Sequence, residues 1–201
     1  MLTHSDLYSL EEYSKIRDEF KKAAVNHRRQ RQVRVGDHMT LHFEDRVTVK
    51  YQIQEMLLIE RTYQSAGIQD ELDAYNPLVP TGSNLKATLT IEYSDAVVRD
   101  GKLKELHSVE DRIFIQVYGH DPVYAVADED MDRSDDVKTS AVHFLRFQLT
   151  EAMIQDFRKS DVDVFVGVDH PKYNEVIKVN ILTKEMLVKD FDEDNILERV
   201  A

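Results

Sequence analysis

Residues 85–93, with the sequence LKATLTIEY, constrain the fold more than any other stretch, because apolar and polar residues alternate there without a break. Successive side chains of a β-strand point to opposite faces of its sheet. The alternation therefore predicts a strand with one face toward a core and the other face toward polar surroundings. The residues expected to face the core are Leu85, Ala87, Leu89, Ile91 and Tyr93.

The segment QVRVGDHMTLHF predicts a β-hairpin that turns around Gly36. A two-residue turn would pair Val35 with His38 and would place the apolar residues of the two strands on opposite faces. A loop of odd length pairs Val35 with Met39 instead, and it gathers all five apolar residues of the segment on one face. We therefore expect the odd loop, with His38 at its tip and His42 on the polar face.

Helical and strand patterns are mixed along the chain. After capping patterns at Thr3 and Ser9, apolar residues from Leu10 onward repeat at helical spacing and predict a long N-terminal helix. A central helix is predicted at about 46–63, and runs of consecutive strands follow it. This order predicts an α+β fold in which a largely antiparallel sheet packs with helices.

The central helix is expected to carry two charges on its apolar face. Asp45 can cap this helix, and Arg46 and Glu60 fall near the middle of the face that holds its aliphatic residues. Arg46 and Glu60 are 14 residues apart, or about 21 Å along a helix, so they cannot pair with each other. The expected partners are Arg146 and Glu92, which lie in predicted strands.

Two interpretations of these charges stay open. Either two buried ion pairs fix the helix to the sheet, or a polar pocket lies where the two meet. In such a pocket, arginine would suit a carboxylate or phosphate group, because its guanidinium donates two parallel hydrogen bonds. The candidate pocket residues are Arg46, Glu55, Glu60, Arg61, Glu92, Arg146 and His170.

His170 is included because it begins the segment His170-Pro171-Lys172-Tyr173, which follows a valine-rich predicted strand. Loops at the ends of strands often carry functional groups. The alternative interpretation is a simple turn whose proline ends the strand.

The chain is acidic, with 38 Asp and Glu residues against 26 Lys and Arg residues and a formal net charge of −12. This charge opposes nonspecific binding to nucleic acid and to anionic membranes. The basic segment at 21–34 is therefore expected to pair with local acids or to face solvent. With no apolar leader and no apolar stretch of about 20 residues, a cytoplasmic protein is expected. Residues 1–201 are predicted to form a single domain, with one candidate subdomain break near 128–138.

Several chemistries are excluded by residues that the sequence lacks. With no cysteine, this chain alone cannot form disulfides or provide thiolate ligands and cysteine nucleophiles. The G-x-G-x-x-G, P-loop, G-x-S-x-G and H-E-x-x-H motifs are missing as well. The acidic stretch from Asp128 begins like an EF-hand loop, but Arg133 stands where that loop needs glycine. We predict no metal site and no cofactor, and whether the chain is an enzyme stays open.

Irregular motifs occur in order along the chain: QIQEM followed by Glu60-Arg61, Tyr75-Asn76-x-Leu78-x-Pro80, Ala87-Thr88-Leu89 with Glu92, Arg146-Phe147, and His170-Pro171-x-Tyr173. In these motifs nearly the whole chain resembles a bacterial domain-of-unknown-function family. Genes of that family tend to neighbour genes for rubrerythrin-like and iron–sulfur oxidoreductase proteins. The resemblance implies a non-catalytic accessory or binding protein in redox or oxidative-stress metabolism, with a rubrerythrin-like or iron–sulfur redox protein as its partner. The alternative is an enzyme or small-ligand binder that uses the candidate pocket.

Overall fold

Two antiparallel sheets enclose the larger apolar core of the protein. The computed structural model describes residues 1–127 and 138–192. The first sheet has the strand order β1-β2-β3-β7-β6, and the second has the order β5-β4-β8-β9. The strands are β1 (Gln32–Val35), β2 (Met39–Glu44), β3 (Asn84–Ile91), β4 (Ile113–Val117), β5 (Val123–Tyr124), β6 (Val126–Ala127), β7 (Val142–Gln148), β8 (Val164–His170) and β9 (Tyr173–Lys178).

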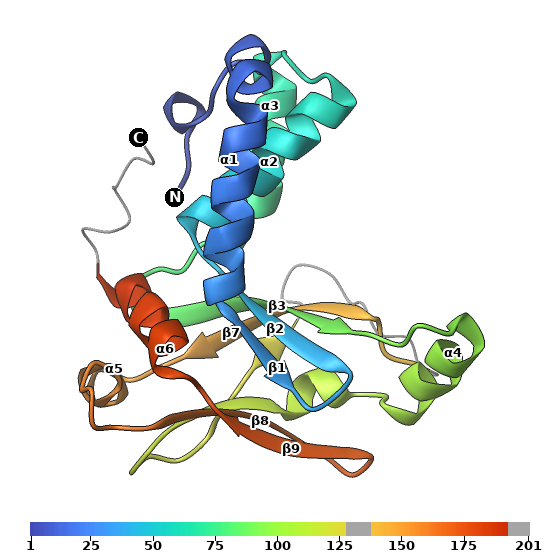
Figure 1. Ribbon diagram of the computed structural model, residues 1–201, viewed down its shortest axis with the longest axis vertical. Helices are drawn as coiled ribbons and strands as arrows, with labels where there is room; N and C mark the ends of the chain where they lie inside the picture. The colour runs from blue at the N-terminus through green and yellow to red at the C-terminus, as the bar shows by residue number, and fades with distance from the viewer. Residues whose placement is uncertain (128–137, 193–201) are drawn as a thin grey trace.

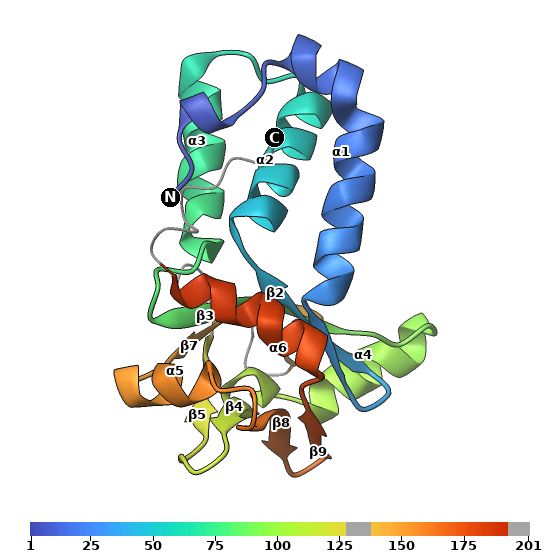
Figure 2. The same cartoon turned by 60° about the vertical axis from the view of Figure 1, so that its left-hand side comes forward.

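The first three helices stand side by side and project away from the first sheet (Figure 1). Turning the molecule shows that α6 lies across the base of this helical bundle, while α4 lies beyond one end of the strands (Figure 2). The α-helices are α1 (Leu10–Gln30), α2 (Arg46–Glu60), α3 (Ser65–Tyr75), α4 (Ala96–Glu105), α5 (Glu151–Phe157) and α6 (Ile181–Val188). Short 3-10 turns are η1 (His4–Asp6), η2 (Asn76–Leu78), η3 (Val109–Arg112) and η4 (Lys189–Phe191). The predicted α+β class is confirmed, and none of the described helices has the length and apolar character needed to cross a membrane.

The hairpin register expected from the sequence is confirmed. Val33 pairs with Leu41 and Val35 pairs with Met39, so the apolar side chains of both strands enter the core between the sheets. His42 pairs with Gln32 on the opposite, polar face. The odd loop forms because a two-residue turn would have placed the apolar side chains of one of the two strands on the polar face of the sheet.

A second, smaller core holds the helical bundle together. It joins the N-terminal segment to α2, α3 and the turn that follows α3, and its buried members are Leu2, Val49, Ile53, Leu57, Leu72, Leu78 and Val79. On the first sheet, Phe144 packs against this cluster from its outer face. The bundle is therefore seated on the sheet by apolar contact as well as by the polar contacts described below.

The prediction that α2 buries Glu60 on its apolar face is wrong. The buried side of α2 includes Gln54, which is 0% exposed and whose amide bonds to both backbone polar groups of Tyr8. Because the N-terminal segment packs on that side, the buried face is turned away from Glu60, which is exposed. The helix also ends at Glu60 rather than near residue 63, since Arg61 adopts a left-handed conformation with φ 55°.

Residues 123–127 form two short strands that belong to different sheets. Tyr124 pairs with Phe114 in the second sheet, whereas Val126 pairs with Arg146 in the first. Between them, the buried Ala125 donates its N–H to the carbonyl oxygen of Ile113. The candidate subdomain break near 128–138 falls on residues 128–137, which lie outside the described residues.

The helical bundle meets the sheets at a buried arginine. Arg31 follows α1 directly and is 1% exposed. Its guanidinium donates to the carbonyl oxygens of Phe43 and Glu44 at 3.1 and 3.2 Å and to that of Met186 at 3.0 Å. One side chain thus connects the end of α1 with the end of β2 and with α6.

Two carboxylates share the Arg31 guanidinium. Asp190 accepts a hydrogen bond from it at 2.5 Å, and Asp45, which caps α2 and contacts His27, lies 3.4 Å away. Burial raises the pKa of Asp190 to about 7, against the opposing effect of Arg31. Burial also acts on Asp45, but Arg31 and His27 outweigh it and lower the pKa of Asp45 to about 2. Because one guanidinium does not neutralise two buried carboxylates, Asp190 holds a proton up to near-neutral pH. Within the basic segment 21–34, His27 and Arg31 thus pair with the acids Asp45 and Asp190, in line with the expectation of acidic partners.

Replacing the buried arginine is expected to destabilise the fold strongly. The substitution Arg31→Met leaves two buried acids without their cation, and breaking such a buried pair costs about 3–5 kcal/mol. Chemical denaturation measures the free energy of unfolding. Arg29→Met is the matched control, because Arg29 is an exposed arginine of the same helix. Equal losses in the two variants would contradict the central role of Arg31.

Because Asp190 shares the Arg31 guanidinium with Asp45 and has a raised pKa, the stability of the fold is expected to depend on pH through Asp190. The carboxyl binds its proton more tightly in the folded protein than in the unfolded chain, so its contribution to stability is complete only below its ordinary pKa of 3.8 and is lost as pH rises from there toward 7. The wild-type protein should therefore lose stability relative to Asp190→Asn over this range, by at most about 1.4 kcal/mol per pH unit. The measurement is denaturation of both proteins at several pH values. A difference that is constant with pH, or one that changes in the opposite direction, would show that Asp190 is ionised throughout.

Candidate functional site

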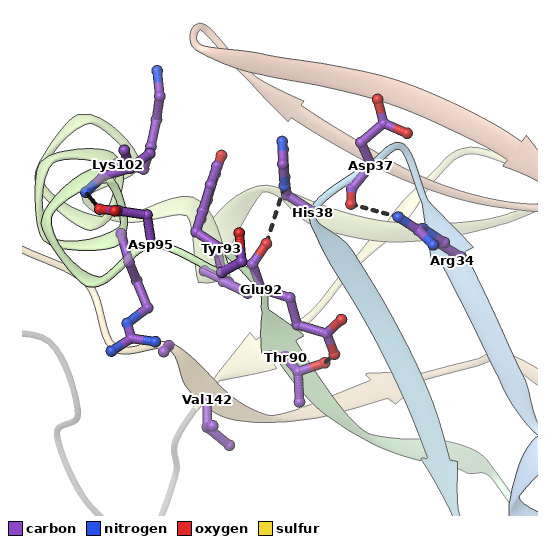
Figure 3. Close-up of a pocket in the computed structure, with 14 residues that line it drawn as sticks. Arg34, Asp37, His38, Thr90, Glu92, Tyr93, Asp95, Lys102 and Val142 are labelled. Carbon is purple, nitrogen blue, oxygen red and sulfur yellow. Dashed lines mark hydrogen bonds between the residues drawn. The ribbon is translucent and has the colours of Figure 1, made fainter.

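An open groove with a volume of about 990 Å³ lies at the tip of the β1–β2 hairpin. It is lined by that hairpin, by the segment that leaves β3, by α4 and by the beginning of β7 (Figure 3). The groove forms here because β3 ends at Ile91 and the chain turns away into α4, leaving the hairpin tip uncovered on this side. The lining residues that matter for its chemistry are Arg34, His38, Glu92, Tyr93, Arg99 and Val142.

The ring of His38 is fixed by several contacts. Its Nδ1 lies 3.0 Å from the carbonyl oxygen of Glu92, and its ring stacks on Tyr93 with centroids 4.0 Å apart and planes 20° apart. The carbonyl oxygen of His38 accepts from the Glu92 N–H at 2.7 Å. Figure 3 shows the His38 and Tyr93 side chains next to each other beside the end of β3.

These contacts determine which ring nitrogen of His38 is available. A carbonyl oxygen can only accept, so Nδ1 must carry the hydrogen in the bond to Glu92. In the neutral ring, Nε2 then carries a lone pair. No described residue forms a hydrogen bond with His38 Nε2. The groove therefore contains a hydrogen-bond acceptor whose position is set before any ligand arrives.

Three basic side chains line the groove, and they differ in their partners. The guanidinium of Arg34 donates to two carbonyl oxygens of its own turn, one of them Asp37 at 2.7 Å. Lys102 pairs with Glu105 at 2.7 Å. Arg99 is exposed, and its guanidinium forms neither an ion pair nor a hydrogen bond with any residue in the described ranges. Arg99 is thus the cation that is available to a ligand.

Two acidic residues of the groove have partners of their own. Glu92 accepts a hydrogen bond from the Thr90 hydroxyl at 2.9 Å. Asp95 caps α4 by accepting the N–H groups of Val97 and Val98, both at 2.8 Å. Apolar surface is present as well, since Val98 is 50% exposed and Val142 is 38% exposed. The groove therefore offers a free cation, a fixed acceptor and an apolar wall.

Of the residues predicted to line a pocket, Glu92 lies in this groove and the others lie elsewhere. Arg46 is paired with Asp6 at 2.5 Å and donates to the carbonyl oxygen of Met1 at 2.6 Å, rather than pairing with Glu92. It holds the N-terminal segment against the beginning of α2.

Glu55 connects α1 with α2. The guanidinium of Arg17 donates to both of its carboxylate oxygens at 2.8 Å, and the Tyr13 hydroxyl donates at 2.7 Å. The Arg17 hydrogen bonds contribute most to lowering the pKa of Glu55, so it stays ionised. This ion pair was not expected from the sequence, which predicted buried pairs for Arg46 and Glu60 instead.

The remaining candidates are separated from one another. Glu60 and Arg61 are exposed at the end of α2, and Arg146 lies on β7 with its guanidinium 3.2 Å from Gln148. His170 is 8% exposed and has both ring nitrogens in hydrogen bonds, to His107 and to Lys172. The structure does not bring the predicted pocket residues together in one place.

His38, Tyr93 and Arg99 were missed as functional candidates. The sequence placed His38 at the hairpin tip and Tyr93 at the end of a strand, which are positions where functional groups are common. No spacing rule connects them, because they line one groove only after β2 pairs with β3 and the chain turns from β3 into α4. Among the described residues, no group of three or more His, Asp and Glu side chains could hold a metal ion.

Comparisons with known proteins agree with this fold. The family described as Protein of unknown function (DUF3501) matches residues 1–191. A crystal structure described as a novel protein of unknown function from Burkholderia pseudomallei is 45% identical in sequence, with a TM-score of 0.90 over 95% of this chain and 99% of that one. No curated protein matches the chain. The resemblance to a domain-of-unknown-function family is thereby confirmed.

Proposed function

The chain belongs to the DUF3501 family of proteins of unknown function, and we propose that it is a binding protein for a small organic anion. The ligand occupies the groove beside His38. Its anionic group, a carboxylate or a phosphate, binds Arg99, and a hydroxyl or N–H group donates to His38 Nε2. The observation that carries this proposal is the presence of an unpaired guanidinium and a fixed, unpaired acceptor in one groove.

Three carboxylates line the groove, those of Asp37, Glu92 and Asp95, and they equal its three Lys and Arg cations in number, so the support for an anion is the local availability of Arg99 and not a net positive charge. Glu92 is bound by Thr90, and Asp95 is bound by the first amides of α4, so these two carboxylates already have donors. Arg99 has no such partner among the described residues. Charge-assisted hydrogen bonds from arginine to a carboxylate or phosphate are about twice as strong as neutral ones. The exposed faces of Val98 and Val142 would contact the carbon skeleton of the ligand.

The proposal predicts binding of simple anions that carry a hydroxyl group. Malate supplies a carboxylate and glycerol 3-phosphate supplies a phosphate, and NMR titration of isotope-labelled protein would locate the site of each. Shifts are expected at His38, Tyr93 and Arg99. Succinate, which is malate without its hydroxyl, should bind more weakly because it leaves His38 Nε2 without a donor.

A matched pair of variants separates the groove from general charge effects. Arg99→Gln should weaken binding by about tenfold, because a hydrogen bond to a charged group contributes roughly 1.5–3 kcal/mol. Arg29→Gln removes an exposed arginine of α1 that is not part of the groove and should leave binding unchanged. Equal binding to the wild type and to the Arg99 variant, or shifts confined to other surfaces, would refute the proposal.

An accessory role in redox or oxidative-stress metabolism rests on the family resemblance alone and stays a prediction, as does a cytoplasmic location. The predicted partner is a rubrerythrin-like or iron–sulfur redox protein. Affinity purification of the tagged chain from its own host, followed by mass spectrometry, should recover that partner, with the tag alone as control. Recovery of no such protein from cells that express it would count against this role.

A further inference from the structure

The backbone at the tip of the β1–β2 hairpin forms two hydrogen bonds with the hydroxyl of Tyr173, which belongs to the second sheet. Tyr173, the first residue of β9, donates its hydroxyl hydrogen to the carbonyl oxygen of Val35 at 2.7 Å. The hydroxyl oxygen of Tyr173 in turn accepts the N–H of His38 at 3.1 Å. One hydroxyl therefore spans the turn and connects its two sides.

Gly36 allows this close approach. Its φ is +64°, a left-handed conformation, and a Cβ at this position would collide with the Tyr173 hydroxyl. Burial raises the pKa of Tyr173 above its ordinary value, so the hydroxyl keeps its hydrogen at neutral pH and can donate and accept at once. The turn is thus shaped to receive a neutral tyrosine.

The segment that carries Tyr173 is itself fixed by a buried histidine. His170 pairs with Tyr173 across the β8–β9 turn. Its Nε2 donates to the carbonyl oxygen of His107 at 3.2 Å, and its Nδ1 accepts the N–H of Lys172 at 3.2 Å. Both nitrogens are engaged with one hydrogen on the ring, so His170 acts as a structural support and not as a free base.

We propose that Tyr173 is a positioning residue for the groove, and that it acts through His38. Tyr173 does not line the groove, but its hydroxyl fixes the backbone of His38, and this backbone position lets Nδ1 bind Glu92 and leaves Nε2 for the ligand. The His170-Pro171-Lys172-Tyr173 segment is therefore part of the binding machinery although it does not contact the ligand. This inference rests on the proposed anion-binding function for its affinity readout only.

The substitution Tyr173→Phe tests this inference because it removes the hydroxyl and keeps the ring. Long-range ¹H–¹⁵N NMR spectra report which nitrogen of His38 carries the hydrogen. In the wild type, Nδ1 of His38 should carry the hydrogen. In the variant, the Nε2–H form, which a histidine side chain prefers in water, should appear. Affinity for malate should fall about tenfold, since Nε2 then no longer accepts a hydrogen bond.

The control is Tyr118→Phe, because Tyr118 is 71% exposed and its hydroxyl forms no hydrogen bond with the described residues. It should change neither the His38 spectrum nor the affinity. A role limited to stability would lower the melting temperature of Tyr173→Phe without changing the His38 tautomer, and that result would overturn the inference. If the wild type binds neither malate nor glycerol 3-phosphate, the proposed function fails, while the tautomer comparison still decides the role of Tyr173.

A measurement on the wild-type protein covers the case in which Tyr173→Phe does not fold. The amide hydrogen of His38 should exchange with solvent at least tenfold more slowly than that of Asp37, its exposed neighbour in the same turn, because only His38 donates to Tyr173. Equal exchange rates would show that the hydroxyl does not hold the turn, and the inference would be wrong.

Discussion

The burial of Arg31 is the interaction on which the arrangement of this protein depends. Its guanidinium reaches the end of β2, the last turn of α6 and two carboxylates, so it connects the helical bundle, the first sheet and the C-terminal helices at one point. A charge buried this deeply is costly unless it is paired and fully hydrogen-bonded. The requirement for these partners fixes where α1 ends and where β1 begins.

The β1–β2 hairpin connects the buried Arg31 with the groove, and its position is fixed at both places. The hairpin starts directly after Arg31 and turns at residues 36–38, and its apolar residues are held in the core between the sheets. At its tip, the second sheet provides Tyr173 and the first provides Glu92 and Tyr93. Both ends of a short hairpin are thus fixed by polar contacts, and the imidazole at its tip has little freedom to rotate. A ligand that meets such a preorganised acceptor loses less entropy on binding.

Local patterns in the sequence predicted local structure well. The alternation at 85–93 and the register of the hairpin follow from side-chain direction in strands, and the caps at Ser9 and Asp45 follow from short-range hydrogen bonding. The partners of charged residues could not be predicted, because Glu55 pairs with Arg17 and Arg31 pairs with Asp190, residues that are distant in the chain. The groove was missed for the same reason, since His38 and Arg99 come from a hairpin and a helix that are distant in the chain and line one groove only in the folded protein.

The proposed ligand is a small organic anion that lies between Arg99 and the free Nε2 of His38, and its binding is open to direct test. A crystal structure of the protein with malate tests it most directly. We expect one carboxylate of malate within hydrogen-bond distance of the Arg99 guanidinium and the hydroxyl of malate within hydrogen-bond distance of His38 Nε2. Malate found on another surface, or in the groove with its hydroxyl turned away from His38, would contradict it.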